Sequence, residues 1–190
     1  MSLLARAPHR SPTRQSGTEY ELAFVEYLRI QGSVALGVDE SRRSLIAGEP
    51  LKSMDYVVLS PGGNFVVDVK GKRFPGGPPT KPRRVWENWV FDEDVKGLLR
   101  WGEAFGGDFQ GLFVFVYKVA TEVTFSGPVL DFLEIDGNRF LFRGIRVAEY
   151  HQRMKRRSPK WGTVDLSRDD FRALVQPLSR LLCAPFDSRR

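Results

Sequence analysis

Residues 54–70 read MDYVVLSPGGNFVVDVK and contain two apolar runs, 54–59 and 64–70, on either side of Ser60-Pro61-Gly62-Gly63. Proline and glycine in the middle segment favour a turn, so we expect the two runs to form an antiparallel β-hairpin. Side chains alternate between the two faces of each strand, and this fixes which residues of the hairpin share a face.

The expected register of this hairpin brings two acids together. With a loop of four residues, Leu59 pairs with Asn64, and Asp55 then lies directly across from Asp68. Carboxylates facing each other, with Cβ atoms roughly 4.5–5.5 Å apart, repel unless one is protonated or a cation lies between them. A hard divalent cation such as Mg²⁺ suits such a pair. Lys70 projects from the same face as Asp68 and could orient water or offset charge on a phosphate.

The rest of the chain alternates between helical and extended patterns. We expect a helix capped by Thr18 that ends before Gly32, because its apolar positions recur at spacings of three and four. The expected elements after it are a strand over 33–38, a long polar connection over 39–53, a strand over 86–91, a helix over 92–105, a buried strand over 112–117, a hairpin of 131–135 and 139–145, and helices around 147–157 and 168–182. This order predicts an α/β or α+β protein with a mixed sheet.

Composition narrows the possible partners and the compartment. The chain has 190 residues, which suggests a single domain, and its net charge of +6 favours nucleic acid as a partner. Cys183 is the only cysteine, so no intramolecular disulfide can form and a reducing, cytoplasmic location is expected. One cysteine and two histidines cannot build a Cys/His zinc site. No apolar run reaches the ~18 residues of a membrane span.

The run Asp68-Val69-Lys70, with Asp55 on the preceding strand, resembles the PD-(D/E)XK nucleases, the restriction-endonuclease-like superfamily. The resemblance implies a single-domain α/β fold in which a mixed sheet is flanked by helices. It covers roughly residues 17–120. The run 54–71 also looks like the nuclease-related domain of bacterial proteins, although Met54 replaces the proline of the superfamily pattern.

Members of this superfamily carry a glutamate on an upstream helix, and two residues compete for that position. Glu21 matches best by its place on the helix, counted back from Gly32. Glu19 is the alternative, because Glu19-Tyr20-Glu21-Leu22 resembles the Glu-x-Glu-Leu of archaeal junction resolvases. The choice between them stays open.

The resemblance also implies a role for each site residue. Asp55 and Asp68 would ligate Mg²⁺ or Mn²⁺, together with the backbone carbonyl of Val69. Lys70 would position the attacking water. Glu21 would bind a second metal or orient the water of the first.

Basic residues in two regions are candidates for DNA contacts, because lysine and arginine bind the phosphate backbone without sequence preference. Lys72 is either such a contact or a solvated lysine at the end of its strand, and the 153–160 cluster is either a contact or a solvated helix end. The candidates are Lys72, Arg73, Arg83, Arg84, Arg153, Lys155, Arg156 and Arg157.

These inferences give one leading hypothesis. We expect a basic arm without regular structure over 1–16, a nuclease-like core over 17–120, and a C-terminal α+β extension over 121–190 packed on that core. The function expected is metal-dependent hydrolysis of DNA phosphodiester bonds, with DNA rather than RNA as the partner. A homodimer would suit cleavage of both strands, and no membrane contact is expected. The alternative is an inactive nuclease-fold protein that binds nucleic acid or a protein partner.

Overall fold

The computed structural model describes residues 12–39, 44–46, 49–76 and 85–183. Its main sheet runs in the order β1-β4-β5-β7-β9-β12, and β8 also pairs with β9. The strands of this sheet are β1 (Val34–Gly37), β4 (Tyr56–Ser60), β5 (Gly63–Arg73), β7 (Phe109–Val119), β8 (Phe132–Ile135), β9 (Asn138–Arg146) and β12 (Gln176–Pro177). The β5 and β7 pair is parallel and the other neighbours are antiparallel, so the sheet is mixed, as expected.

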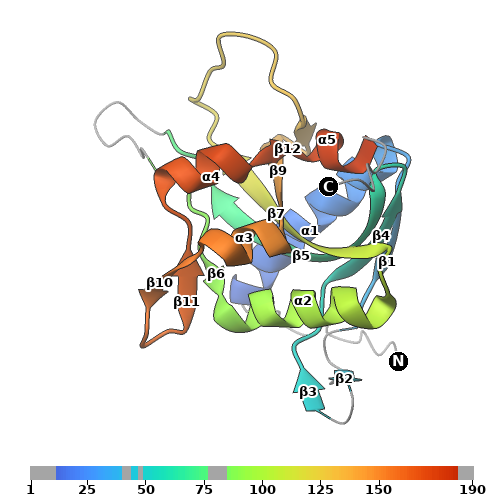
Figure 1. The fold of residues 1–190 in the computed structure, drawn as a ribbon. Coiled ribbons are helices and arrows are strands. Elements are labelled where there is room, and N and C mark those ends of the chain that lie inside the picture. The colour runs from blue at the N-terminus through green and yellow to red at the C-terminus, as the bar shows by residue number, and fades with distance from the viewer. Residues whose placement is uncertain (1–11, 40–43, 47–48, 77–84, 184–190) are drawn as a thin grey trace, which may run out of the picture.

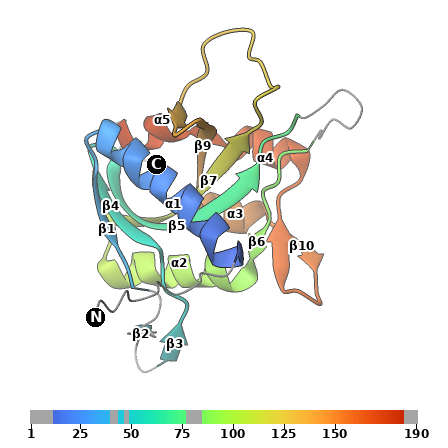
Figure 2. The same cartoon turned by 180° about the vertical axis from the view of Figure 1, so that it is seen from behind.

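Helices cover both faces of this sheet. They are α1 (Pro12–Ile30), α2 (Asp92–Phe105), α3 (Val147–Arg153), α4 (Arg168–Leu174) and α5 (Leu178–Cys183). Figure 2 shows α1 across one face, and α3 lies on the other face in Figure 1. Parallel strands need a crossover connection, and α2 forms part of the one between β5 and β7.

The two faces of β5 contribute to different hydrophobic cores. Phe65 and Val67 pack in the core that contains Phe24 of α1. Val66 packs in the other core, with Val95 of α2. This alternation follows from the two-residue period of a strand. It places even-numbered side chains of β5 on the α2 side of the sheet and odd-numbered side chains on the α1 side.

A glycine lets α1 approach β5 closely. A Cβ atom at Gly71 would lie 2.3 Å from the ring of Tyr20, so the aromatic ring rests directly on the backbone of the strand. At the other end of the same hairpin, the N–H of Gly62 donates to the carbonyl oxygen of Leu182 in α5, at 2.6 Å. The first contact holds β5 against α1, and the second holds the turn of the hairpin against α5.

Smaller sheets lie beside the main one. A hairpin of β10 (Lys155–Ser158) and β11 (Thr163–Asp165) pairs through β11 with β6 (Val90–Phe91). This hairpin projects from the body next to the first turn of α2 (Figure 1). A second hairpin is formed by β2 (Ser44–Ile46) and β3 (Glu49–Leu51).

Most expected elements are confirmed. The hairpin has the expected register, with Leu59 opposite Asn64. Helix α2 has the expected bounds and ends at Gly106, whose φ of 99° favours glycine. Ser167 caps α4 and accepts a hydrogen bond from the N–H of Asp170 at 3.1 Å.

Five expectations were wrong. The strand expected over 86–91 is limited to Val90–Phe91, the only residues of that described range that pair with another strand. Helix α1 begins at Pro12 rather than near Thr18, and proline is favoured at the first helical position. The connection expected over 39–53 contains the β2–β3 hairpin. The helix expected to reach residue 157 ends at Arg153, because the residues after it pair with β11. The last expected helix is split by β12, in which Pro177 cannot continue a helical hydrogen-bond pattern.

Candidate active site

The ladder between β4 and β5 ends just before the acid-x-Lys run. Its last registered pair is Tyr56 with Val67, although β5 continues to Arg73. Beyond this point the N–H of Val69 donates to the Asp55 carboxylate (N···Oδ2 2.6 Å). A backbone donor that loses its ladder partner must find another, and here Asp55 supplies it. The Asp55 side chain is therefore held at the peptide group that joins Asp68 to Val69.

The register around Asp55 differs from simple continuation of the hairpin. Its own N–H donates to the carbonyl oxygen of Val67 at 2.9 Å, one residue short of Asp68. The Asp55 carboxylate reaches Val69 instead of lying in a regular cross-strand pair with Asp68. Asp55 therefore binds the residue next to Asp68 on β5.

Lys70 links two carboxylates on the α2 side of the sheet. Its Nζ atom lies 2.7 Å from Asp68 Oδ2 and 2.6 Å from Asp94 Oδ2. Asp94 belongs to the first turn of α2 and is fully buried. The expectation that Asp68 and Lys70 share a face agrees with this ion pair.

Asp94 is a site residue that sequence reasoning did not identify as such. Its carboxylate accepts from the N–H of Phe91 at 3.1 Å, which satisfies a backbone donor at the start of α2, and it also pairs with Lys52. The sequence signalled only a helix start, at Asp92 or Asp94. The contact with Lys70 depends on how α2 packs on β5, which the spacing along the chain does not reveal.

Burial and charge act against each other on these groups. Burial raises the pKa of Asp68, while Lys70 lowers it only in part. Burial would also raise the pKa of Asp94, but Lys70 and Lys52 hold it below its usual value. Burial alone would depress the pKa of Lys70, but Asp68 and Asp94 raise it above the ordinary value. Lys70 is therefore a fixed cation at neutral pH.

Lys72 lies on the same face and is only 5% exposed. Its Nζ atom donates to the carbonyl oxygen of Trp89 at 2.9 Å and lies 3.5 Å from the centre of the Trp89 ring. Burial lowers its pKa to about 7. Lys72 is thus a packed interior group, and the alternative of a solvated strand-end lysine was wrong.

The helix glutamates lie on α1, which covers the opposite face of the sheet from Asp68 and Lys70. Glu19 pairs with Lys118 of β7 at 2.5 Å, and Glu21 is partly buried. Over the described residues, no three His, Cys, Asp or Glu side chains form a group arranged to hold a metal ion. The structure therefore brings Asp55, Asp68 and Lys70 together but does not add Glu21 to them.

Apart from the buried Lys72, the basic candidates fall into two groups. Arg83 and Arg84 lie outside the described residues. Arg73 at the end of β5 is exposed, as are four residues in and before the β10–β11 hairpin, namely Arg153, Lys155, Arg156 and Arg157. Of these, Arg153 lies 3.5 Å from Asp170 and Arg157 lies 3.7 Å from Asp165, so both are partly neutralised.

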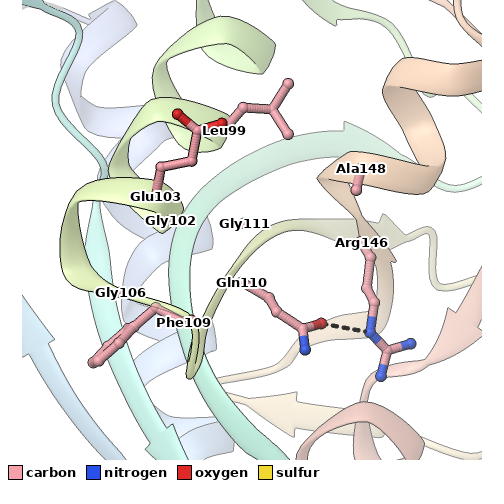
Figure 3. Close-up of a pocket in the computed structure, with 10 residues that line it drawn as sticks. Leu99, Gly102, Glu103, Gly106, Phe109, Gln110, Gly111, Arg146 and Ala148 are labelled. Atoms are coloured by element: carbon pink, nitrogen blue, oxygen red, sulfur yellow. Dashed lines mark hydrogen bonds between the residues drawn. The ribbon is translucent and has the colours of Figure 1, made fainter. Parts of the chain in front are cut away.

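A separate cavity of about 330 Å³ lies at the other end of α2 (Figure 3). Glu103 of α2 lines it, and Gln110 accepts a hydrogen bond from Arg146 at 2.9 Å. Asp94 and Lys70 do not line this cavity, which is therefore distinct from the candidate site.

The fold has a relative among solved structures. The structure is similar to Hjc of Archaeoglobus fulgidus, a Holliday junction resolvase, with a TM-score of 0.51 and 12% sequence identity over 87% of this chain and 99% of that chain. The chain has the restriction-endonuclease-like fold. At this identity the likeness establishes the fold alone, and it confirms the mixed sheet flanked by helices. No family model and no curated protein sequence matches the chain.

The candidate site lies on the central sheet of this fold. The sequence resemblance assigned the acid-x-Lys run to the second strand of a hairpin, and this run occupies β5 of the confirmed fold.

No helix in the described part of the chain is long and apolar enough to span a bilayer.

Proposed function

We propose that this chain is a metal-dependent nuclease that hydrolyses DNA phosphodiester bonds. The observation that carries the proposal is the contact of the Asp55 carboxylate with the peptide of Val69, between Asp68 and Lys70. It gathers the separate parts of the acid-x-Lys pattern at one point of a restriction-endonuclease-like fold. The ion pair of Lys70 with Asp68 adds a fixed cation beside two acids.

The chemistry of the donors suits a hard divalent cation. Asp55, Asp68 and the carbonyl of Val69 offer oxygen atoms, which Mg²⁺ and Mn²⁺ prefer. The raised pKa of Asp68 reflects a buried carboxylate that Lys70 only partly compensates, and a bound cation would supply the missing positive charge. When bound, the metal would acidify water and offset charge on the phosphate.

The chain's own residues would then position and stabilise the reacting groups. Lys70 is held protonated by two carboxylates, so its Nζ atom is suited to donate hydrogen bonds to a water or a phosphate oxygen rather than to remove a proton. Asp94 positions Lys70 from α2 without facing the substrate itself. The role of Glu21 as a further ligand remains part of this proposal and would need side-chain movement around β5.

The basic surface supports DNA as the substrate. Arg73 lies at the end of the strand that carries Lys70, and Lys155 and Arg156 lie on the neighbouring hairpin. Such exposed cations suit sequence-independent contacts with phosphates, which weaken with salt.

The test is cleavage of duplex, branched and single-stranded DNA in a titration of Mg²⁺ and Mn²⁺. Asp68→Ala and Lys70→Ala are compared with the exposed control variants Asp169→Ala and Lys96→Ala. We expect metal-dependent cleavage that both site variants lose and both controls keep. Absence of cleavage with retained, salt-sensitive DNA binding would favour an inactive binding protein. Cleavage that survives Asp68→Ala would refute the site.

A further inference from the structure

An open groove of aromatic and basic residues lies beside the candidate active site. It has a volume of about 510 Å³, within the range of about 300–1,000 Å³ typical of ligand sites. We call it the tryptophan groove, and its lining residues are Trp89, Phe91, Arg157, Ser158, Trp161 and Thr163. They come from the β10–β11 hairpin and from β6 and the residues before it.

Two of the aromatic rings of the groove face solvent. Trp161 lies in the turn of the β10–β11 hairpin and is 68% exposed, and Phe91 is 38% exposed. A large aromatic side chain exposed at the turn of a projecting hairpin contributes little to the core of its own chain. It can instead contribute its ring face to a ligand.

Each ring of the groove has a cation next to it. Arg157 lies 5.3 Å from the centre of the Trp89 ring, and Lys160 lies 5.5 Å from the centre of the Trp161 ring. Lys52 lies 5.6 Å from the ring of Phe91. Asp165 neutralises part of the charge of Arg157. Flat apolar rings interleaved with cations complement a chain of planar bases joined by anionic phosphates.

The tryptophan groove is connected to the candidate site by short contacts. The Trp89 ring packs on Lys72, which is two residues beyond Lys70 on the same face of β5. Phe91 donates its N–H to Asp94, and Asp94 pairs with Lys70. A strand whose phosphate lies at Lys70 would therefore carry its neighbouring nucleotides toward the groove.

We propose that the tryptophan groove binds unpaired bases of a DNA strand by stacking them on Trp161 and Phe91, with Arg157 and Lys160 contacting phosphates. This inference rests on the proposed nuclease function and deepens it. It makes the substrate a DNA with single-stranded nucleotides next to the cleaved bond. A fully paired duplex keeps its base faces stacked on each other and cannot offer them to the rings.

The proposal is tested by binding without metal, so that it does not depend on catalysis. Fluorescence anisotropy of a labelled oligothymidylate and of a labelled duplex is measured in EDTA. The proteins are wild type, Trp161→Ala and Trp161→Phe. Phe105→Ala is the control, since it removes another exposed aromatic ring at the far end of α2.

We expect Trp161→Ala to weaken oligothymidylate binding about 5- to 150-fold, the loss typical of one stacked base. Trp161→Phe should keep most of the affinity, because it retains a ring, and Phe105→Ala should bind like wild type. Duplex binding should change little in any of these variants. Because binding is measured in EDTA, a loss of affinity in Trp161→Ala is separate from any loss of cleavage.

Three results would overturn the proposal that the tryptophan groove binds unpaired bases, whatever the cleavage assay shows. They are unchanged oligothymidylate affinity in Trp161→Ala, an equal loss for duplex and single strand, and no oligothymidylate binding by wild type. Tighter, Trp161-dependent binding of oligouridylate would replace DNA by RNA as the ligand. Loss of oligothymidylate binding in Trp161→Ala, together with slower metal-dependent cleavage of DNA that has unpaired nucleotides next to the cleaved bond, would support both proposals.

Discussion

Lys70 Nζ lies 2.6 Å from Asp94 Oδ2, so an ion pair joins the middle of the central sheet to the first turn of α2. Asp94 is fully buried and also accepts from the N–H of Phe91. The Asp94 carboxylate therefore accepts a hydrogen bond from the backbone at the start of α2 and also holds Lys70 in place. The position of Lys70 depends on the packing of a helix that follows it in sequence.

We expect Asp94→Asn to impair cleavage and stability together. The amide can still accept from Phe91, but it cannot balance the charge of Lys70, which would lose one of its two partners. Loss of a charge-assisted contact at a buried site costs about 1–3 kcal/mol, so unfolding should occur at lower urea concentration and the cleavage rate should fall about 5- to 150-fold. Cleavage at the wild-type rate would contradict a positioning role for Asp94.

Asp92→Asn is the matched control for this change. Asp92 lies in the same turn of α2 but pairs with the exposed Lys96, at 2.5 Å. Exposed pairs contribute little to stability. We expect this variant to stay within about 0.5 kcal/mol of wild type and to cleave normally.

We expect Mg²⁺ to raise the thermal midpoint of the wild type but not of Asp68→Asn. A ligand at 100 times its Kd adds about 2.7 kcal/mol, or roughly 5–10 °C for a chain of this size. Because burial raises the pKa of Asp68, protons compete with the metal, and the shift in midpoint should become smaller as the pH is lowered. Differential scanning calorimetry measures this, and an equal shift in both proteins would place the metal elsewhere.

The lowered pKa of the buried Lys72 predicts that the free energy of unfolding depends on pH above neutrality. Its folded pKa of about 7 lies below the ordinary value of 10.5, so the unfolded chain binds more protons between these values. The contribution of Lys72 to the free energy of unfolding should therefore rise with pH between these two pKa values, by up to about 1.4 kcal/mol per pH unit. Urea unfolding at pH 7 and pH 9 should show this rise in wild type and its loss in Lys72→Met.

Lys96→Met is the control for the Lys72 prediction, because Lys96 is exposed on α2. Its stability should follow the wild-type pH dependence. Parallel behaviour of the wild type and Lys72→Met would mean that Lys72 stays charged in the folded protein.

The close approach of α1 to β5 predicts the effect of a single methyl group. Gly71→Ala would place a Cβ atom 2.3 Å from the Tyr20 ring, so the ring would have to shift from its packed position. Overpacking of this kind costs about 1–3 kcal/mol. At Gly107 no atom lies within 4 Å of a new Cβ, so Gly107→Ala should be nearly neutral. Urea unfolding of both variants measures the contrast, and equal midpoints would refute the packing.

The sequence predicts the hairpin well because local chemistry determines it. Pro61 and Gly62 mark the turn, and the two-residue period then places Asp68 and Lys70 on one face. The register between Leu59 and Asn64 follows from the same turn. These features need no information from distant parts of the chain.

The features that the sequence does not reveal depend on long-range packing. Asp94 meets Lys70 only because α2 crosses over β5. Lys72 is buried because Trp89, far along the chain, covers it. Residues 155–158 have no strong strand pattern and become extended by pairing with β11. Helical periodicity cannot anticipate such pairing, so the basic cluster was assigned to the wrong element.

The hydrogen bond from Gly62 to Leu182 has a consequence for how the protein is made. It joins residues 120 positions apart (62 to 182) and connects the turn of the β4–β5 hairpin to the last described helix. Contacts of such long range form late, since their loop-closure entropy must be overcome first. On the ribosome, the hairpin emerges early but stays unlatched until α5 has been synthesised. A newly made chain would therefore complete this contact only after residue 182 has been synthesised.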